Sequence, residues 1–210
     1  EKDYGDAPNT GGYGNPRHDV STMLTLGPSV TTESAGYNSP TASGDVDNAI
    51  GAMPPFTAGS TATVPVAVSG GTGFLQAWID WNQDGDFGDA GEQIVTNAVD
   101  GGAGDTDGST NGTIELSVSV PASALSGNTF ARFRISSTAG LNESDDARDG
   151  EVEDYVATIS GGVVPGPPTC PAPLVLVSST GNADTVITTA SFSNNALGAP
   201  EAAGLSANTG

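Results

Sequence analysis

The sequence is poor in basic residues and has no long apolar run. Lysine and arginine together number 5 against 25 aspartates and glutamates, so the formal net charge is −20. Nucleic acids and anionic membrane surfaces would repel such a chain, and we expect neither as a partner. Without an apolar run of spanning length, no membrane insertion is expected. The first residues are already polar, which favours a mature, exported chain.

Cysteine and histidine each occur once. Cys170 excludes a disulfide within the chain, and a lone cysteine is either a small buried hydrophobe or a thiol that bridges two molecules. His18 lies in a Gly/Asn/Pro-rich stretch, where exposed polar surface is more common than a catalytic base. Zinc-ligand pairs, nucleophile elbows and phosphate loops are absent. We therefore expect no enzyme, although the many acids leave a glycosidase-type carboxylate pair open.

The periodicity that is present is that of β-strands rather than helices. Two-residue alternation occurs in four stretches, 64–68, 114–120, 131–135 and 152–158; in the first, valines alternate with Pro65 and Ala67. Gly, Asn, Asp and Ser turns separate them, which predicts an all-β fold, a β-sandwich of the jelly-roll kind. Pro65 predicts an edge strand or a bulge. Residues 27–60 and 98–112 have the composition of long loops.

A change in composition divides the chain after this domain. We predict a β-sandwich over residues 1–160, an extended Pro/Gly-rich connector over 161–173 and a β extension over 174–210. The extension has two strand-like runs, 174–178 and 184–192, and is too short to bury a core of its own. It either packs on its own domain or adds strands to a neighbouring molecule. Its candidate assembly residues are Cys170, Val175, Val177, Val186, Ile187 and Phe192.

Acidic residues are concentrated in two short segments. Residues 80–92 hold five of them and residues 143–154 hold seven. Such clustering costs Coulomb repulsion, which a divalent cation offsets. The first segment begins with the spacing of an EF-hand loop, but Gly91 stands where that loop needs a bidentate Glu, and the preceding residues have a strand pattern. It predicts a calcium loop in a β context, with an ion-free Asx-rich turn as the alternative. The expected ligands are Asp80, Asn82, Asp84, Asp86, Asp89 and Glu92.

The second segment has the alternation of a strand. Glu151, Glu153 and Tyr155 are expected on one face, with Val152 and Asp154 on the other. Acids this close repel one another unless a cation or Arg148 lies among them. The alternative is a solvated, charged edge strand that prevents aggregation.

Four motifs in order resemble a known family. They are Asp-Tyr-Gly-Asp-Ala-Pro at 3–8, Ala-Trp-Ile-Asp-Trp-Asn-Gln-Asp-Gly-Asp-Phe at 77–87, Ala-Arg-Phe-Arg-Ile-Ser at 131–136 and Gly-Glu-Val-Glu-Asp-Tyr at 150–155. Residues 3–159 thereby resemble the GEVED domain, a module of large exported bacterial proteins that include surface proteins, adhesin-like proteins and secreted proteases. The resemblance implies a secreted β-sandwich and implies little about activity. The acidic segment that the family usually has before its core strands has only residues 45–48 as its nearest counterpart here.

The first and last of these motifs suggest a second calcium site. If they pair as neighbouring strands or share a cation, Asp3 and Asp6 join the acids of the last motif. This weaker site would comprise Asp3, Asp6, Asp149, Glu151, Glu153 and Asp154.

These features favour an extracellular, calcium-stabilised structural or adhesive module of the bacterial cell surface. Its partners would be copies of itself, in a filament or surface layer, or other surface proteins. The alternative is a calcium-dependent carbohydrate-binding module that stacks glycans on Trp78, Trp81 or Tyr37, although alternation places the two tryptophans on opposite faces. An accessory domain of a secreted hydrolase is a third reading.

Overall fold

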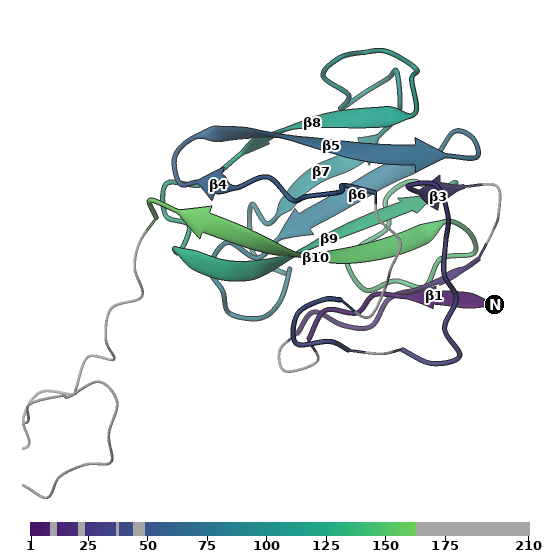
Figure 1. Cartoon of the computed structure of the whole chain (residues 1–210), viewed down its shortest axis with the longest axis horizontal. Helices are drawn as coiled ribbons and strands as arrows, with labels where there is room; N and C mark the ends of the chain where they lie inside the picture. The colour runs from purple at the N-terminus through teal and green to yellow at the C-terminus, as the bar shows by residue number, and fades with distance from the viewer. Residues whose placement is uncertain (9–11, 21–23, 37, 44–48, 163–210) are drawn as a thin grey trace, which may run out of the picture. The chain divides into compact units, whose positions relative to one another are not determined.

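The computed structural model describes residues 1–8, 12–20, 24–36, 38–43 and 49–162, and every regular element in them is a β-strand (Figure 1). The strands are β1 (Lys2–Tyr4), β2 (Arg17–Asp19), β3 (Thr25–Leu26), β4 (Phe56–Thr57), β5 (Thr61–Ser69), β6 (Phe74–Ile79), β7 (Gln93–Ala98), β8 (Thr113–Ser119), β9 (Gly127–Ser136) and β10 (Glu151–Ser160). Helices that span a membrane do not occur among these residues.

Two sheets of unequal size form the sandwich. The larger has the order β4-β10-β9-β6-β7 and the smaller the order β3-β5-β8, while β1 and β2 make a separate antiparallel ribbon. In the larger sheet only β4 and β10 run parallel. The predicted all-β, sandwich-like fold is confirmed.

The core lies between the two sheets, where the predicted alternation is observed. The inward residues of the long strands are buried: Val64, Val66, Val68, Ile114, Leu116, Val118, Ala131, Phe133 and Ile135. A second, smaller apolar cluster contains Ala7, Tyr13, Trp78 and Phe87. Residues of the N-terminal segment thus cover part of the larger sheet's outer face, which explains why that face is not exposed.

Pro65 departs from its prediction for a physical reason. Its strand, β5, lies between β3 and β8, so it is not an edge strand. Short β3, however, pairs only with Val68 and Ser69 and does not reach Pro65. On the β3 side, therefore, no strand lies beside Pro65, and its missing N–H costs no hydrogen bond between strands.

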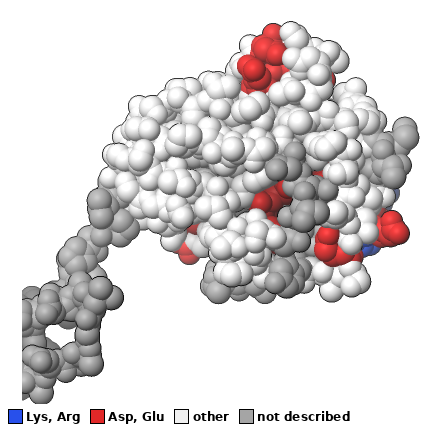
Figure 2. Space-filling model, in the orientation of Figure 1, with Lys and Arg blue, Asp and Glu red and all other residues white. Residues whose placement is uncertain are grey.

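The chain divides into two compact units, Glu1–Pro165 and Gly166–Gly210, and the ten strands belong to the first. The predicted assembly residues, which run from Cys170 to Phe192, lie outside the described residues, as do Tyr37 and residues 45–48. On the face drawn in Figure 2, acidic side chains gather at separate places, and the blue of lysine and arginine is scarcely visible.

Candidate functional site

The acidic segment 80–92 is the connection between β6 and β7. One carboxylate oxygen from each of Asp80, Asp84 and Glu92 lies within 4.8 Å of the other two. Asp80 and Glu92 are buried at the two ends of the connection, whereas Asp84 is exposed at its turn. The sequence therefore brings three carboxylates together from the start, the middle and the end of one short loop.

Hydrogen bonds from the backbone explain the curl of this loop. Asp80 follows β6, and its two carboxylate oxygens accept N–H groups of Gln83 at 2.6 Å and Gly85 at 3.1 Å. Gly85 has a φ of 96°, which a side chain would disfavour. Glu92 closes the other end, because its oxygens accept the N–H of Trp81 at 3.2 Å and of Asp89 at 3.1 Å.

The electrostatics of the loop are those of crowded negative charge. Burial raises the pKa of Glu92 to about 7, and the charges of Asp80, Asp84 and Asp89 add to the shift. Burial also raises the pKa of Tyr13, whose hydroxyl donates to Asp80 Oδ2 at 2.5 Å. None of the three ion pairs among the described residues involves a carboxylate of this loop; the guanidinium of Arg132 lies over the ring of Phe87, 5.3 Å from its centroid.

The other predicted ligands lie beside the three carboxylates rather than among them. The side-chain amide of Asn82 donates to Asp84 at 2.9 Å and to Asp89 at 2.5 Å, so Asn82 and Asp89 border the group. Asp86 turns elsewhere: its Oδ1 accepts the N–H of Gly88 at 2.8 Å, and its side chain lies against Gly12.

The second acidic segment is mostly buried. Glu151, Glu153 and Asp154 are at most 5% exposed, and so are Asp3 and Asp6. Their strand, β10, lies between β4 and β9, although β4 pairs only with Ile159 and Ser160. The alternative of a solvated, charged edge strand is wrong because these acids are not open to water.

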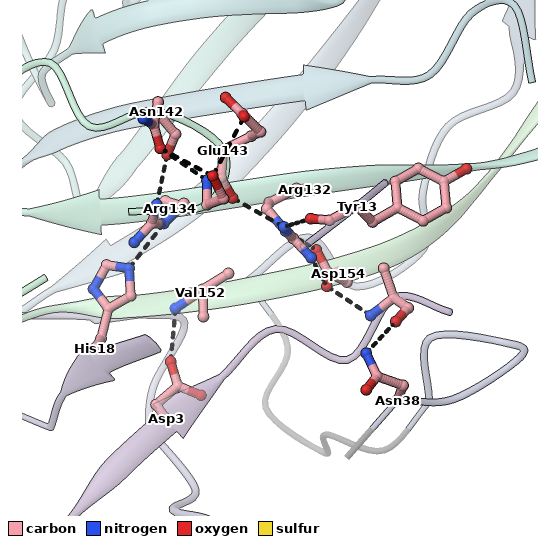
Figure 3. Close-up of polar contacts among 12 residues, drawn as sticks. Asp3, Tyr13, His18, Asn38, Arg132, Arg134, Asn142, Glu143, Val152 and Asp154 are labelled. Atoms are coloured by element: carbon pink, nitrogen blue, oxygen red, sulfur yellow. Dashed lines mark hydrogen bonds and ion pairs between the residues drawn. The ribbon is translucent and has the colours of Figure 1, made fainter. Parts of the chain in front are cut away.

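Side chains, not a shared strand ladder, join the first and last motifs. The predicted pairing of the two motifs as neighbouring strands is wrong, because β1 pairs with β2. Instead Asp3 Oδ2 accepts the N–H of Val152 at 2.7 Å, as Figure 3 shows, and Asp154 Oδ2 accepts the N–H of Ala7 at 2.7 Å. The motifs nevertheless lie against each other, as their acids suggested.

One predicted member of the second site, Asp149, is placed apart from it, and so is Arg148, the arginine that could have lain among its acids. Asp149 accepts hydrogen bonds from the hydroxyl of Ser136 at 2.7 Å and the N–H of Ser137 at 2.9 Å, and so holds a turn. Arg148 is exposed and forms none of the ion pairs in the described part of the chain.

The basic groups among these acids are two buried arginines of β9, which the sequence reasoning did not single out. Arg132 forms a two-armed ion pair with Asp154, with both nitrogen–oxygen distances at 2.7 Å. Its remaining arm donates to the carbonyl oxygens of Tyr13 and of Glu143, the latter at 2.9 Å (Figure 3). One side chain thus ties the N-terminal segment, the 141–149 loop and β10 together.

Arg134 holds His18 in a neutral form. Arg134 Nε donates to His18 Nε2 at 3.0 Å, and His18 Nδ1 donates to the carbonyl oxygen of Asp149 at 2.7 Å. Burial, together with the charge of Arg134, lowers the pKa of His18 to about 3. The expectation that His18 is exposed is wrong, because it lies on β2 with no exposed surface. Alternation placed the two arginines on the face of β9 opposite to Phe133, but it did not indicate which segments would cover and bury them.

Both tryptophans are buried, on opposite faces of β6 and the loop that follows. Trp78 is 2% exposed in the smaller apolar cluster and Trp81 is 4% exposed in the main core. The prediction that they lie on opposite faces is confirmed, but the expectation that either stacks on a glycan is wrong because neither is accessible.

Comparison with protein families finds a match for the part of the chain that contains these groups. Residues 74–158 match the GEVED domain. The chain carries a GEVED domain. The match begins at β6 and reaches into β10. It therefore includes the acidic hairpin, which is the connection of residues 80–92 between β6 and β7, and also both buried arginines and Glu151 to Asp154. The predicted resemblance began at residue 3, whereas the N-terminal motif lies outside the match. Neither a curated protein nor a solved structure matches the chain.

The first residue of the signature for which the GEVED domain is named has a clear structural role here. Gly150 has a φ of 84°, and a Cβ at this position would overlap the carbonyl oxygen of Ile135. Only glycine combines this φ with so close an approach to β9. The turn into β10 therefore depends on Gly150, and the acids that follow are aligned by it.

Proposed function

We propose that this GEVED domain is an extracellular, calcium-stabilised structural module of a bacterial surface, used for assembly or adhesion rather than for catalysis. The observation that carries the proposal is the convergence of Asp80, Asp84 and Glu92 on one point within 4.8 Å. Calcium is the cation that suits them, because it prefers six to eight oxygen ligands at about 2.3–2.6 Å in an adaptable geometry. Asp89 lies at the border of the group and would complete the shell with water, whereas Asn82 would join only if its side-chain amide turned its oxygen toward the ion.

The balance of buried charge supports a second cation. Five buried carboxylates lie in or next to β1 and β10, namely Asp3, Asp6, Glu151, Glu153 and Asp154. Arg132 and Arg134 are the buried arginines beside them, while His18 is neutral and Lys2 of β1 is only half-buried. A divalent cation would lower the repulsion among these carboxylates.

A structural role follows from where these groups lie. A calcium ion at the hairpin would bind Asp80 at the end of β6 and Glu92 just before β7, so it would stabilise the loop that joins two neighbouring strands. An ion near β10 would be bound by acids of both the N-terminal motif, residues 3–8, and β10, and so would hold the two together. Binding to the folded state alone stabilises that state by mass action.

Calcium titration calorimetry of the full chain tests the proposal. We expect wild-type protein to bind calcium, and we expect Glu92→Gln to weaken one class of sites about tenfold or more, because it removes a buried carboxylate ligand. Asp86→Asn is the matched control: it lies in the same loop and changes the same charge, but Asp86 is outside the group of three. Equal effects of the two substitutions, or no binding by wild-type protein, would overturn the proposal.

A further inference from the structure

The sandwich has one side on which both sheets end. β7 is the last strand of the larger sheet and β8 the last strand of the smaller one, and the two lie beside each other without pairing. Two hollows lie along this side. One, of about 430 Å³, is lined by Ile94 and Val95 of β7 and by Leu116 and Ser117 of β8, and the other, of about 350 Å³, by Trp81, Glu92, Pro121 and Ser123.

The first half of the outer edge of β8 is already covered by the loop from β7. Thr106 donates its N–H to the carbonyl oxygen of Glu115 at 2.9 Å, and Asp105 Oδ1 accepts the N–H of Glu115 at 3.0 Å. Asn111 accepts the N–H of Thr113 at 2.8 Å. This loop therefore acts as a partial neighbouring strand and stops at Thr106.

The second half of that edge has no neighbouring strand among the described residues. Antiparallel pairing with β5 alternates, and Glu115 directs its backbone groups outward, so Ser117 and Ser119 do the same. Both serines are exposed, and Ile94 and Val95 opposite them are only half-buried. An open strand edge above half-covered apolar side chains is a template for one more strand.

The sequence itself contains a segment with the required pattern. Residues 184–192 read Asp-Thr-Val-Ile-Thr-Thr-Ala-Ser-Phe, rich in β-branched residues and with one charge. Val186, Ala190 and Phe192 share one face of such a strand with Asp184 and Thr188, while Ile187 lies on the other face with Thr185, Thr189 and Ser191. The first face carries three of the four apolar residues and suits the hollow, and the near-neutral segment avoids repulsion by an acidic domain.

The connector is long enough for this strand to reach a second molecule. Its start lies near the second hollow, since the N–H of Gly162 donates to Ser126 Oγ at 2.9 Å in the segment that follows Pro121. At about 3.1 Å per residue, a proline-rich connector of the length of residues 161–173 can span about 40 Å, which is enough to reach the edge of a second copy.

We propose that residues 184–192 of one molecule add as a strand to the β8 edge of a second copy at Ser117–Ser119, between β7 and β8. This rests on the proposed assembly role and names its partner and acceptor. Each molecule has one donor and one acceptor, so the contact is head-to-tail and leads to open filaments rather than closed dimers.

Disulfide trapping between two different variants tests the contact. Each variant first receives Cys170→Ser; one then carries Ser117→Cys and the other Thr189→Cys. We expect a cross-linked dimer upon mild oxidation, with the 117–189 peptide pair identified by mass spectrometry. Thr113→Cys in place of Ser117→Cys is the control on the covered half of the same strand and should not cross-link. A link that forms only when both cysteines are on one chain, or in neither arrangement, overturns the proposal.

A substitution that blocks the edge provides the second test. Ser117→Pro removes an outward N–H without removing a bond to β5, so the domain should melt within a few degrees of wild type while the assembled fraction falls at least tenfold in light scattering. Ser117→Thr should assemble like wild type. Full assembly of Ser117→Pro would overturn the proposal. The calcium response of Ser117→Pro should be unchanged, which separates failure of this contact from failure of the calcium proposal.

Discussion

The carboxylate of Asp154 receives both arms of the Arg132 guanidinium in a place where neither side chain has any exposed surface. When one partner of such a buried pair is removed, the other remains as an uncompensated charge, which costs about 3–5 kcal/mol. We predict that Asp154→Asn lowers the free energy of unfolding by about this amount. Urea unfolding followed by the fluorescence of the two buried tryptophans measures the change.

An exposed ion pair supplies the comparison. Arg17 and Asp146 are in contact at 2.6 Å, but their side chains are 45% and 59% exposed. Water and salt screen such a pair, so Asp146→Asn should change the stability little. Similar losses in the two variants would mean that Asp154 does not have the structural role assigned to it.

Gly150 is a second residue on which the fold depends. Its positive φ and the closeness of the Ile135 carbonyl act together, and we predict that Gly150→Ala lowers the free energy of unfolding by about 2 kcal/mol or more. Gly140→Ala separates the two causes: φ is 74° there, but an added Cβ meets nothing within 4 Å. It should cost about 1 kcal/mol. Equal costs, measured by the same unfolding experiment, would show that the contact with β9 does not matter.

At the scale of elements, the ribbon of β1 and β2 is attached to the larger sheet partly through His18. The histidine faces Arg134 and Arg132 of β9 and the backbone of Asp149, and its pKa falls from 6.5 to about 3 on folding. Below pH 6.5 the unfolded chain therefore binds a proton that the folded chain does not. The contribution of neutral His18 to the free energy of unfolding is therefore fully present above pH 6.5. It should fall by about 1.4 kcal/mol per pH unit as the pH drops toward 3.

Many carboxylates also titrate in acid, so the effect of His18 is measured by comparing the pH dependence of stability of wild type with that of a variant. His18→Gln keeps a donor and an acceptor but cannot bind a proton, so its stability should fall less steeply than that of wild type between pH 6.5 and 4.5. Urea unfolding at a series of pH values measures both slopes. Parallel slopes would contradict the account of His18.

The strands themselves were predictable from the sequence, because inward residues such as Leu116 and Phe133 alternate with polar ones and the core lies on one side. The segments that cover the outer face of the larger sheet were not predictable in this way. Arg132 and Arg134 have the spacing of exposed residues, and only contacts with distant segments, around Tyr13 and Glu143, bury them. Local pattern does not encode such long-range contacts.

The acidic hairpin shows the same limit within a single loop. Spacing identified the segment, and the predicted ligands included Asp80, Asp84 and Glu92. They also included Asp86, because alternate positions look equivalent in a sequence. The backbone bond from Gly88 and the neighbouring Gly12 direct Asp86 away, and both are properties of the folded loop.

For the whole molecule, the distribution of charge is the central feature. With 5 basic residues against 25 acidic ones, the protein cannot pair most of its carboxylates internally. Several acids are nevertheless buried, at the hairpin and around β10, where repulsion is least screened. We propose that calcium offsets this repulsion in the extracellular medium and thereby stabilises the domain.

Thermal unfolding of the full chain, with calcium and with excess chelator, tests this claim most directly. At a calcium concentration about 100 times the dissociation constant of one site, binding stabilises the folded state by about 2.7 kcal/mol. For a domain of this size we predict that the melting temperature rises by about 5–10 °C with calcium and returns to the lower value with chelator. Identical melting temperatures under both conditions would contradict the account, since the acidic clusters would then be charged turns and buried carboxylates without a cation.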